Sequence, residues 1–346
     1  MVVAWNMPEP SLSDKVTFLL RLEAYADGTT RVDLKETHMS YVFLTDQHAW
    51  KLKKPAREEY LDFSTLDARR RNAEREVTLN RRLASDVYEG IVPLAMDPRG
   101  GMHLGGHGEV VDWLVKMRRL PEHRMLDHAI AAGDIRTEDV ERVASVLARF
   151  YQAASVISIS ASEYRHRLES DVNATADELC RADYGLPRES IEALRAAQLR
   201  VLRTEPGLFD ERVRQGKVVD AHGDLRPEHI CLANHVVIID CLEFNADFRK
   251  LDPASELAFF ALECERLGAS WVGDQVLAVY EQETGDRPPR RLLDFYKRQH
   301  ALTRAKIAVW HLKDSGPELR NKWIGKAKDY LLRAGQSISS PTEPPR

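Results

Sequence analysis

Two aspartates in the middle of the chain have a setting that suits phosphoryl transfer. Asp224 lies in the loop His-Gly-Asp-Leu-Arg-Pro-Glu-His at 222–229, and Asp240 follows the apolar run at 236–239. A strand that is buried and runs directly into a carboxylate is an expensive place for a charge unless the charge has a use. One aspartate can orient a hydroxyl group and accept its proton, while the other can hold Mg²⁺ on the phosphates of a nucleotide.

The composition is that of an ordinary globular chain. Its 346 residues are 43% hydrophobic and 30% charged, with a formal net charge of −4 at pH 7. This length suffices for one large or two moderate domains. Because the small negative charge does not indicate binding to nucleic acid or to an anionic membrane, we expect neither as a partner. The sequence leaves the oligomeric state open.

No targeting or membrane segment is expected. Residues 1–10 lack the basic region and apolar core of a signal peptide. No apolar run approaches the ~20 residues that a membrane-spanning helix needs. The four cysteines show no C-x-x-C spacing, which is typical of reduced thiols and predicts a cytoplasmic protein. The polar, proline-containing tail at 336–346 is expected to be disordered.

Hydrophobic periodicity predicts a β-rich first part. Helices are expected at 11–26 and 67–83, and strands at 31–34, 41–44, 48–53, 91–95, 101–104 and 110–117. Alternation in the strand 48–53 places Ala49, Lys51 and Lys53 on one face and Trp50 and Leu52 on the other.

A change of pattern near residue 120 marks a boundary, after which helices dominate. They are expected at 122–132, 137–155, 160–181 and 187–203 and throughout 253–334, with short strands at 218–220 and 236–239 on either side of the loop that carries Asp224. Periodicity alone therefore predicts the α+β class.

The loop 222–229 resembles the catalytic loop of the protein-kinase-like superfamily, whose pattern is H-x-D-L-[KR]-P-E-N. Its His-Gly-Asp start is most similar to aminoglycoside and choline phosphotransferases. Further segments resemble a poorly characterised group of aminoglycoside phosphotransferase family enzymes, namely Glu36–Ser40, Lys51–Pro55, Leu61–Leu66 and Ile239–Asn245. Members of that group often carry a C-terminal P-loop domain, whose G-x-x-x-x-G-K-[ST] motif does not occur in this sequence.

This resemblance spans roughly residues 15–335 and implies a protein-kinase-like fold of two lobes. The small β-rich N-lobe would comprise residues 1–118, and the large helical C-lobe would comprise residues 119–335, with the nucleotide between them. The segment at 115–120 resembles the hinge. Asp252 and Glu256 resemble residues that brace the active site in related phosphotransferases.

The resemblance implies that Asp224 is the catalytic base and that Asp240 binds Mg²⁺. Arg226 either stabilises charge on the transferred phosphoryl group or forms a salt bridge with Glu228 or another loop acid.

His229 is a departure, because the superfamily usually has an asparagine there as the second Mg²⁺ ligand, and imidazole suits Mg²⁺ less well. Three possibilities are open. His229 itself binds metal, for instance Mn²⁺, or it acts through a water molecule, or Glu228, Glu243 or Asn245 supplies the missing oxygen.

Lys51 matches the lysine that holds the α- and β-phosphates of ATP, in the pattern A-x-K. Lys53 lies on the same face and could replace it. Glu76 is the expected ion-pair partner of that lysine, with Glu74 as its rival. The segment before the second strand has no glycines for the phosphates, so the hydroxyls of Thr37 and Ser40 are candidate contacts instead.

These residues together predict an ATP-dependent phosphotransferase that transfers the γ-phosphate to a hydroxyl of a small molecule, such as a sugar, an amino sugar or an aminoglycoside-like acceptor. A regulatory, nucleotide-binding pseudokinase is the alternative. A metal-dependent hydrolase using His222, His229 and Asp240 is a weaker one, because their spacing fits no familiar metal-ligand motif.

Overall fold

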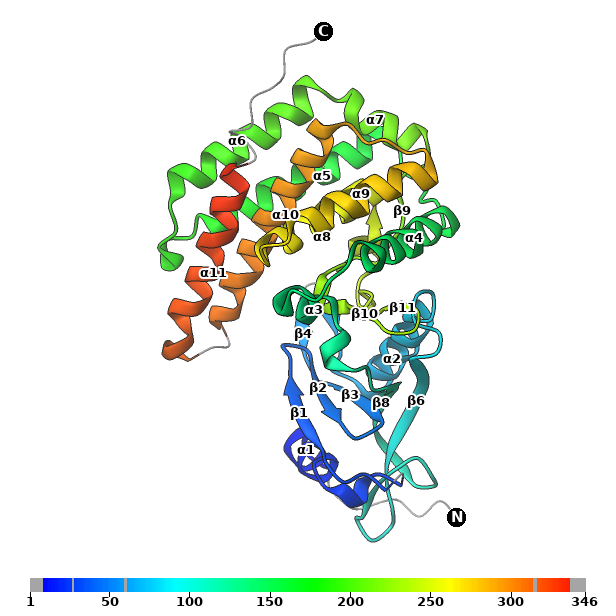
Figure 1. The fold of residues 1–346 in the computed structure, drawn as a ribbon. Helices are drawn as coiled ribbons and strands as arrows, with labels where there is room; N and C mark the ends of the chain where they lie inside the picture. The colour runs from blue at the N-terminus through cyan, green and yellow to red at the C-terminus, as the bar shows by residue number, and fades with distance from the viewer. Residues whose placement is uncertain (1–8, 27, 59–60, 314–315, 337–346) are drawn as a thin grey trace. The chain divides into compact units, whose positions relative to one another are not determined.

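The chain divides into two compact units. The computed structural model describes residues 9–26, 28–58, 61–313 and 316–336. One unit consists of Met1–Ala129 with Glu228–Phe248, and the other of Ile130–Pro227 with Arg249–Arg346. The first carries a curled β-sheet and the second is helical (Figure 1), which confirms the predicted α+β class. The predicted tail lies outside the described residues apart from Gln336, which ends a helix.

A six-stranded antiparallel sheet forms the centre of the first unit, in the order β1-β2-β3-β8-β6-β7. Its strands are β1 (Asp33–Glu36), β2 (Ser40–Leu44), β3 (His48–Lys53), β6 (Tyr88–Met96), β7 (Met102–Leu104) and β8 (Glu109–Arg118). Two short strands, β4 (Arg57–Glu58) and β5 (Leu61–Asp62), form a separate hairpin. The predicted strands of this region are all present; β3 has the predicted bounds, and the bounds of the others differ by one to a few residues.

Lys51 and Lys53 lie on the same face of strand β3. Trp50 and Leu52 belong to the hydrophobic core that the short helix α1 (Leu12–Leu19) completes. Because side chains alternate along a strand, Lys51 and Lys53 project from the opposite face of the sheet.

Helix α2 (Leu66–Asn80) packs against β6 and β8. Thr65 caps it by accepting a hydrogen bond from the N–H group of Ala68, at 3.1 Å. The buried stripe of α2 has helical spacing and contains Arg69, Asn72, Ala73, Glu76, Val77 and Asn80. Glu76 therefore lies inside the first unit, where its negative charge needs a partner.

The hairpin of β10 (Ile230–Leu232) and β11 (Val236–Ile238) joins the first unit although it lies far along the chain. Cys231 and Val237 pack with Ala73 and Val77 of α2 and with Tyr88 of β6. This apolar contact explains why Glu228–Phe248 groups with the sheet, whereas the resemblance implied a C-lobe that comprises the whole of 119–335.

Helices make up most of the second unit. They are α4 (Thr137–Ala153), α5 (Ala161–Leu179), α6 (Arg188–Thr204), α7 (Gly207–Arg214), α8 (Pro253–Arg266), α9 (Ser270–Thr284), α10 (Arg290–Trp310) and α11 (Pro317–Gln336). The central helix α8 packs on α9 and α10, and most of its residues are buried. A short pair of strands, β9 (Val219–Asp220) and β12 (Lys250–Leu251), precedes it. Helix α3 (Leu126–Ala132) follows the sheet in the chain.

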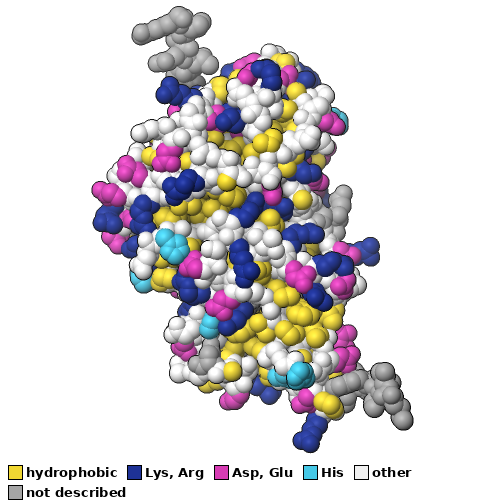
Figure 2. Space-filling model, turned by 90° about the vertical axis from the view of Figure 1, so that its right-hand side faces the viewer, with side chains coloured by type: hydrophobic (Ala, Val, Ile, Leu, Met, Phe, Trp, Pro, Cys, Tyr) yellow, Lys and Arg dark blue, Asp and Glu magenta, His cyan; other side chains and the backbone are white. Residues whose placement is uncertain are grey.

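Charged side chains of both signs lie on the face of the molecule shown in Figure 2. Lys, Arg, Asp and Glu side chains are mixed over the face shown in Figure 2, in agreement with the net charge of −4. Among the described residues, no helix combines the length and the apolar character needed to cross a membrane.

A buried arginine fixes the start of α8. Arg212 on α7 contacts Asp252, the N-cap residue of α8, with Nε–Oδ2 and Nη2–Oδ1 distances of 2.7 Å. It also binds Asp286, with an Nη1–Oδ1 distance of 2.5 Å. All three side chains are at most 4% exposed, so each charge depends on the others.

The contact between α8 and α10 holds a histidine in its neutral form. His300 Nε2 lies 3.0 Å from the Ser255 hydroxyl, and the ring stacks on Phe259 with centroids 4.8 Å apart. Burial lowers the pKa of His300 to about 4, despite the opposing charge of Asp224.

Replacing Arg212 should strongly destabilise the second unit. In Arg212→Met, buried Asp252 would lose its cation and buried Asp286 would keep only Lys217, at 3.6 Å, so we expect the free energy of unfolding to fall by ~3–5 kcal/mol. Urea denaturation measures this loss. The matched control is Arg214→Met, because Arg214 lies on the same helix but is 67% exposed, and its loss should cost less than ~1 kcal/mol. Equal losses in the two variants would contradict this role for Arg212.

His300 should make stability fall as the solution becomes acidic. Its pKa is about 4 in the folded protein and near the ordinary 6.5 in the unfolded chain, so between these values the unfolded chain binds more protons. Stability present near neutral pH is therefore lost as pH falls from 6.5 toward 4, by about 2 kcal/mol at pH 5 relative to pH 7. Urea denaturation of the wild type and of His300→Gln at both pH values tests this; an identical pH dependence in both would contradict it.

Candidate functional site

Lys51 on β3 forms an ion pair with Glu76 on α2. Lys51 Nζ lies 2.8 Å from Glu76 Oε1, and the Glu76 side chain is 0% exposed. Glu74, the rival partner, is exposed and pairs with Arg70 of its own helix at 3.0 Å. The difference follows from helical geometry, because Glu76 falls on the buried stripe of α2 and Glu74 does not.

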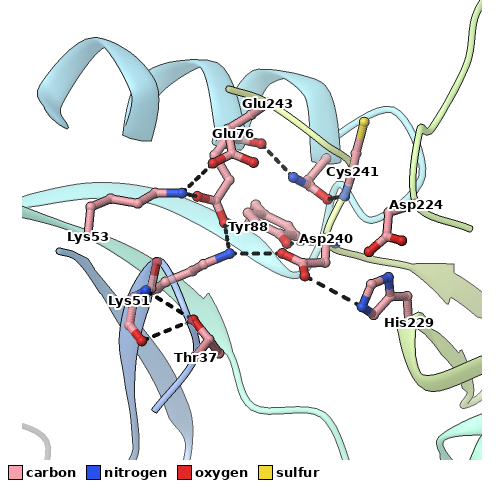
Figure 3. A network of polar contacts seen from close by, with 12 residues as sticks. Thr37, Lys51, Lys53, Glu76, Tyr88, Asp224, His229, Asp240, Cys241 and Glu243 are labelled. Carbon is pink, nitrogen blue, oxygen red and sulfur yellow. Dashed lines mark hydrogen bonds and ion pairs between the residues drawn. The ribbon is translucent and has the colours of Figure 1, made fainter. Parts of the chain in front are cut away.

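Lys53 lies two residues further along β3 and binds two carboxylates. Its Nζ contacts Glu76 and lies 2.5 Å from Oε1 of Glu243, in the segment that follows β11. The ammonium groups of Lys51 and Lys53 thus share the carboxylate of Glu76 (Figure 3). Glu243, considered above as a replacement oxygen donor for a second metal, is engaged by Lys53.

Asp240 is the solvent-facing end of this network. Its Oδ1 lies 2.8 Å from Lys51 Nζ, its Oδ2 lies 3.5 Å from His229 Nε2, and its side chain is 42% exposed. Figure 3 shows the carboxylate between these two basic side chains. The first unit therefore brings together Lys51, Lys53, Glu76, His229 and Asp240 from four places in the sequence.

The backbone of Asp240 is held in an unusual conformation. Its φ of 62° is left-handed, and among the described non-glycine residues it is the one with positive φ. Such a conformation persists only when the surroundings enforce it. The N–H group of Asp240 donates to the Tyr88 hydroxyl at 3.2 Å, and the N–H group of Cys241 donates to Asn80 Oδ1 at 2.8 Å. Tyr88 and Asn80 thereby orient the Asp240 side chain.

The ion pairs shift the pKa values of Lys51, Glu76 and Asp240 toward their charged forms. Burial lowers the pKa of Lys51, but Asp240 and Glu76 outweigh it and the net pKa lies well above the ordinary value. Crowding by protein raises the pKa of Asp240, but Lys51 and then His229 bring it well below the ordinary range. Burial also opposes ionisation of Glu76, yet Lys51 and Lys53 lower its pKa. Glu243 differs, because burial raises its pKa even though Lys53 opposes this.

The groups around Asp240 suit a metal ion that takes most of its ligands from phosphate and water and few from the protein. Among the described residues, no group of three or more His, Cys, Asp and Glu side chains is arranged to hold a metal ion. A zinc-type site, which the hydrolase alternative requires, needs such a group. Mg²⁺ instead binds one or two protein carboxylates together with phosphate oxygens and water. The exposed carboxylate of Asp240 fits that requirement, with His229 as its neighbour.

Thr37 and Ser40 close the turn between β1 and β2. Thr37 Oγ1 bonds both the N–H group and the carbonyl oxygen of Ser40, at 3.0 Å each. The Ser40 hydroxyl is buried and has no hydrogen-bond partner among the described residues. The Thr37 hydroxyl is thus occupied by the turn itself, and contact of either hydroxyl with a phosphate stays a prediction.

A buried glutamate supports the loop that leads to Asp224 in the second unit. Glu256 on α8 accepts hydrogen bonds from the N–H groups of His222 and Gly223, at 3.1 and 2.5 Å, and from the hydroxyl of Tyr151, at 2.8 Å. His222 is fully buried, and its Nδ1 accepts the N–H group of Asp224 at 3.3 Å. Glu256 and His222 therefore shape the backbone around Asp224, in keeping with the bracing role that the resemblance implied.

Arg226 binds Asp224 within the loop. Its Nε and Nη2 lie 3.0 and 2.9 Å from Asp224 Oδ2. This contact is a salt bridge to a loop acid, one of the two possibilities left open by the sequence, and it leaves the Asp224 side chain 24% exposed. The guanidinium is placed to orient the carboxylate.

Sequence reasoning does not single out Tyr88, Asn80 or Tyr151. Asn80 follows Glu76 by four positions on the buried stripe of α2, and a buried amide at that spacing is a signal that could have identified it. Tyr88 and Tyr151 carry no comparable signal, because a tyrosine in a strand or helix is ordinarily a core residue.

The curated proteins that this chain matches in sequence are described as uncharacterised. An uncharacterised protein of Mycobacterium tuberculosis and one of Mycobacterium bovis are each 33% identical to this chain over 321 residues. The match covers 90% of this chain and 60% of each relative, so the chain spans less than two thirds of their length. No protein-family model matches the chain.

Solved structures with a similar fold are small-molecule kinases. A choline/ethanolamine kinase family protein of Mesorhizobium loti is 16% identical with a TM-score of 0.55, and the alignment covers 94% of this chain and 95% of that one. The GDP complex of aminoglycoside 2′-phosphotransferase-IIIa is 14% identical with a TM-score of 0.59, at 94% and 98% coverage. A choline kinase of Cryptosporidium parvum is 9% identical with a TM-score of 0.54, at 94% and 95% coverage. At these identities the likeness establishes architecture, and the chain therefore has the protein-kinase-like fold that the loop at 222–229 predicted.

Proposed function

We propose that this protein is an ATP-dependent phosphotransferase that moves the γ-phosphate to a hydroxyl group of a small molecule. The observation that carries the proposal is the position of Lys51, which bridges buried Glu76 and exposed Asp240 at 2.8 Å each. A lysine fixed by a buried acid beside an exposed carboxylate suits a phosphate contact next to a metal ligand. The solved small-molecule kinases of the same fold support this reaction class.

Residues of the first unit would hold the nucleotide phosphates. Lys51 is the candidate contact for the α- and β-phosphates, kept in place by Glu76. Asp240 would hold the cation, with His229 beside it. When bound, Mg²⁺ neutralises charge on the phosphates and on the oxygen that leaves. The network supports this assignment by its own charge: two lysines face three carboxylates, and the most exposed acid is Asp240.

Residues of the second unit would act on the acceptor. Asp224 is the candidate base that orients the hydroxyl and accepts its proton as the new oxygen–phosphorus bond forms and the bond to the departing ADP breaks. Arg226, bound to the same carboxylate, would fix its direction, and its guanidinium would stabilise negative charge that develops on the transferred group.

The acceptor that we propose is a sugar, an amino sugar or an aminoglycoside-like alcohol, and the location that we propose is the cytoplasm. A screen of these compounds and of polyols for consumption of ATP tests the proposal, with Mg²⁺ and Mn²⁺ in parallel. GTP belongs in the same screen, because the solved aminoglycoside 2′-phosphotransferase-IIIa was captured with GDP.

A regulatory pseudokinase is the second candidate, favoured by one observation. His229 faces Asp240 at 3.5 Å, where the resembled enzymes have an asparagine. A pseudokinase would bind nucleotide without turnover, and its function would survive Asp224→Asn. Turnover with any acceptor would remove this alternative.

Substitution of the two aspartates tests the assigned roles. Asp224→Ala and Asp240→Ala should each lower the rate of phosphoryl transfer by roughly 100- to 10,000-fold, with the melting temperature little changed. Nucleotide binding separates the roles, because Asp224→Ala should still bind the nucleotide with its metal and Asp240→Ala should bind it more weakly. Asp67→Ala, at an exposed acid on α2, is the control and should retain full activity. Full turnover by either active-site variant would reject these roles.

A further inference from the structure

The charged network of the first unit is exposed at Asp240 and buried over most of its remaining length. The exposed fraction of the side chain falls from 42% at Asp240 to 14% at Lys51 and 2% at Lys53, and it is 8% at Glu243 and 0% at Glu76. A ligand in solution can reach the outer pair of Asp240 and Lys51. Lys53, Glu76 and Glu243 form an inner group that a ligand does not reach in this arrangement.

The inner group has a geometry of its own. Lys53 Nζ contacts Glu76 and lies 2.5 Å from Glu243, and it stands over the ring of Phe63, 5.5 Å from the centroid. Its charge is therefore committed to two buried acids and an aromatic face. This is unlike Lys51, whose second partner, Asp240, faces solvent.

Glu243 connects this group to the metal-ligand candidate. It lies three residues after Asp240 in the segment that follows β11, and its side chain reaches Lys53 on β3. Arg75 of α2 holds the same residue through its main chain, with 3.5 Å between Nη1 and the carbonyl oxygen of Glu243. The segment that carries Asp240 is thus attached to the sheet and to α2 at its far end, while Tyr88 and Asn80 hold its near end.

We propose that Lys53 and Glu243 are positioning residues that form an inner ion pair and anchor the segment carrying Asp240. Because Lys53 also binds Glu76, that carboxylate is shared between two ammonium groups, and Lys51 remains extended toward Asp240. Lys53 then does not substitute for Lys51 as a phosphate ligand. The anchoring part of this inference stands independently, and its effect on nucleotide binding rests on the proposed phosphotransferase function.

Removal of either partner should loosen the segment. In Lys53→Met, Glu76 and Glu243 would remain buried near each other with one cation fewer, and in Glu243→Met, Lys53 would lose its link to the segment. Amide hydrogen exchange followed by mass spectrometry should show exchange at 239–245 accelerated at least ~10-fold in both variants. The double variant Lys53→Met/Glu243→Met removes the charges together, and it should be no worse than the worse single variant if the two act as a pair.

Lys15→Met is the matched control. Lys15 is 5% exposed and pairs with buried Asp112 at 2.9 Å in the same unit, and Asp112 keeps Arg69 as a second partner. Exchange at 239–245 should not respond to this change. Three results would each reject the anchoring role of the Lys53–Glu243 pair. They are equal acceleration in Lys15→Met and Lys53→Met, no acceleration in Glu243→Met, and additive effects in the double variant.

Nucleotide affinity supplies a second and separate readout. Both single variants should bind ATP with Mg²⁺ at least ~10-fold more weakly, although neither side chain is expected to touch the nucleotide. Weakening by Lys53→Met alone, with Glu243→Gln and Glu243→Met unchanged, would make Lys53 a direct ligand and overturn its positioning role. If the wild type bound no nucleotide at all, the proposed function would fail while the exchange experiment still decided the anchoring.

Discussion

The fully buried carboxylate of Glu76 is the constraint on which the candidate nucleotide site depends. A fully buried glutamate stays charged only when its partners compensate for the lost hydration, and for Glu76 two lysines from one strand do so. Because both lysines must reach α2 from β3, strand and helix are fixed relative to each other. Lys51 can then extend to Asp240, and Lys53 can extend to Glu243. One buried charge thus sets the positions of four others.

In the second unit, too, a buried glutamate supports the segment that carries a candidate functional aspartate. Glu256 is also a buried glutamate, but main-chain N–H groups and a tyrosine hydroxyl satisfy it where Glu76 has lysines. Hydrogen bonds to a carboxylate are stronger than those between neutral groups, so the loop that carries Asp224 has a defined backbone. Helix α8 is itself held at its start by Asp252 and Arg212. Each unit therefore places its candidate functional aspartate through a buried acid that touches no substrate.

Much of the architecture was predictable because it rests on short-range patterns. The alternation of residues 48–53 predicted a strand with two lysines on one face, and the periodicity of residues 67–83 predicted a helix. The structure has this strand at His48–Lys53 and this helix at Leu66–Asn80. Strand β10 and helix α7 were missed. Three apolar residues in a loop-like setting carry too little periodicity to indicate a strand, and α7 is a short helix whose hydrophobic residues are few.

The sequence alone was enough to predict the α+β class, the loop at 222–229 with Asp224, and the position of Asp240 directly after an apolar strand. All three are local features of the chain. Tertiary structure decided which partners meet. Lys51 pairs with Glu76 and not with Glu74, Arg226 pairs with Asp224, and Lys53 pairs with Glu243. Tyr88 and Asn80 accept hydrogen bonds from the main chain at 240–241. Apart from the pair of Arg226 and Asp224, which lie two residues apart, these contacts join residues distant in sequence. They depend on how α2, β3 and the β10–β11 hairpin pack, and no local pattern encodes that packing.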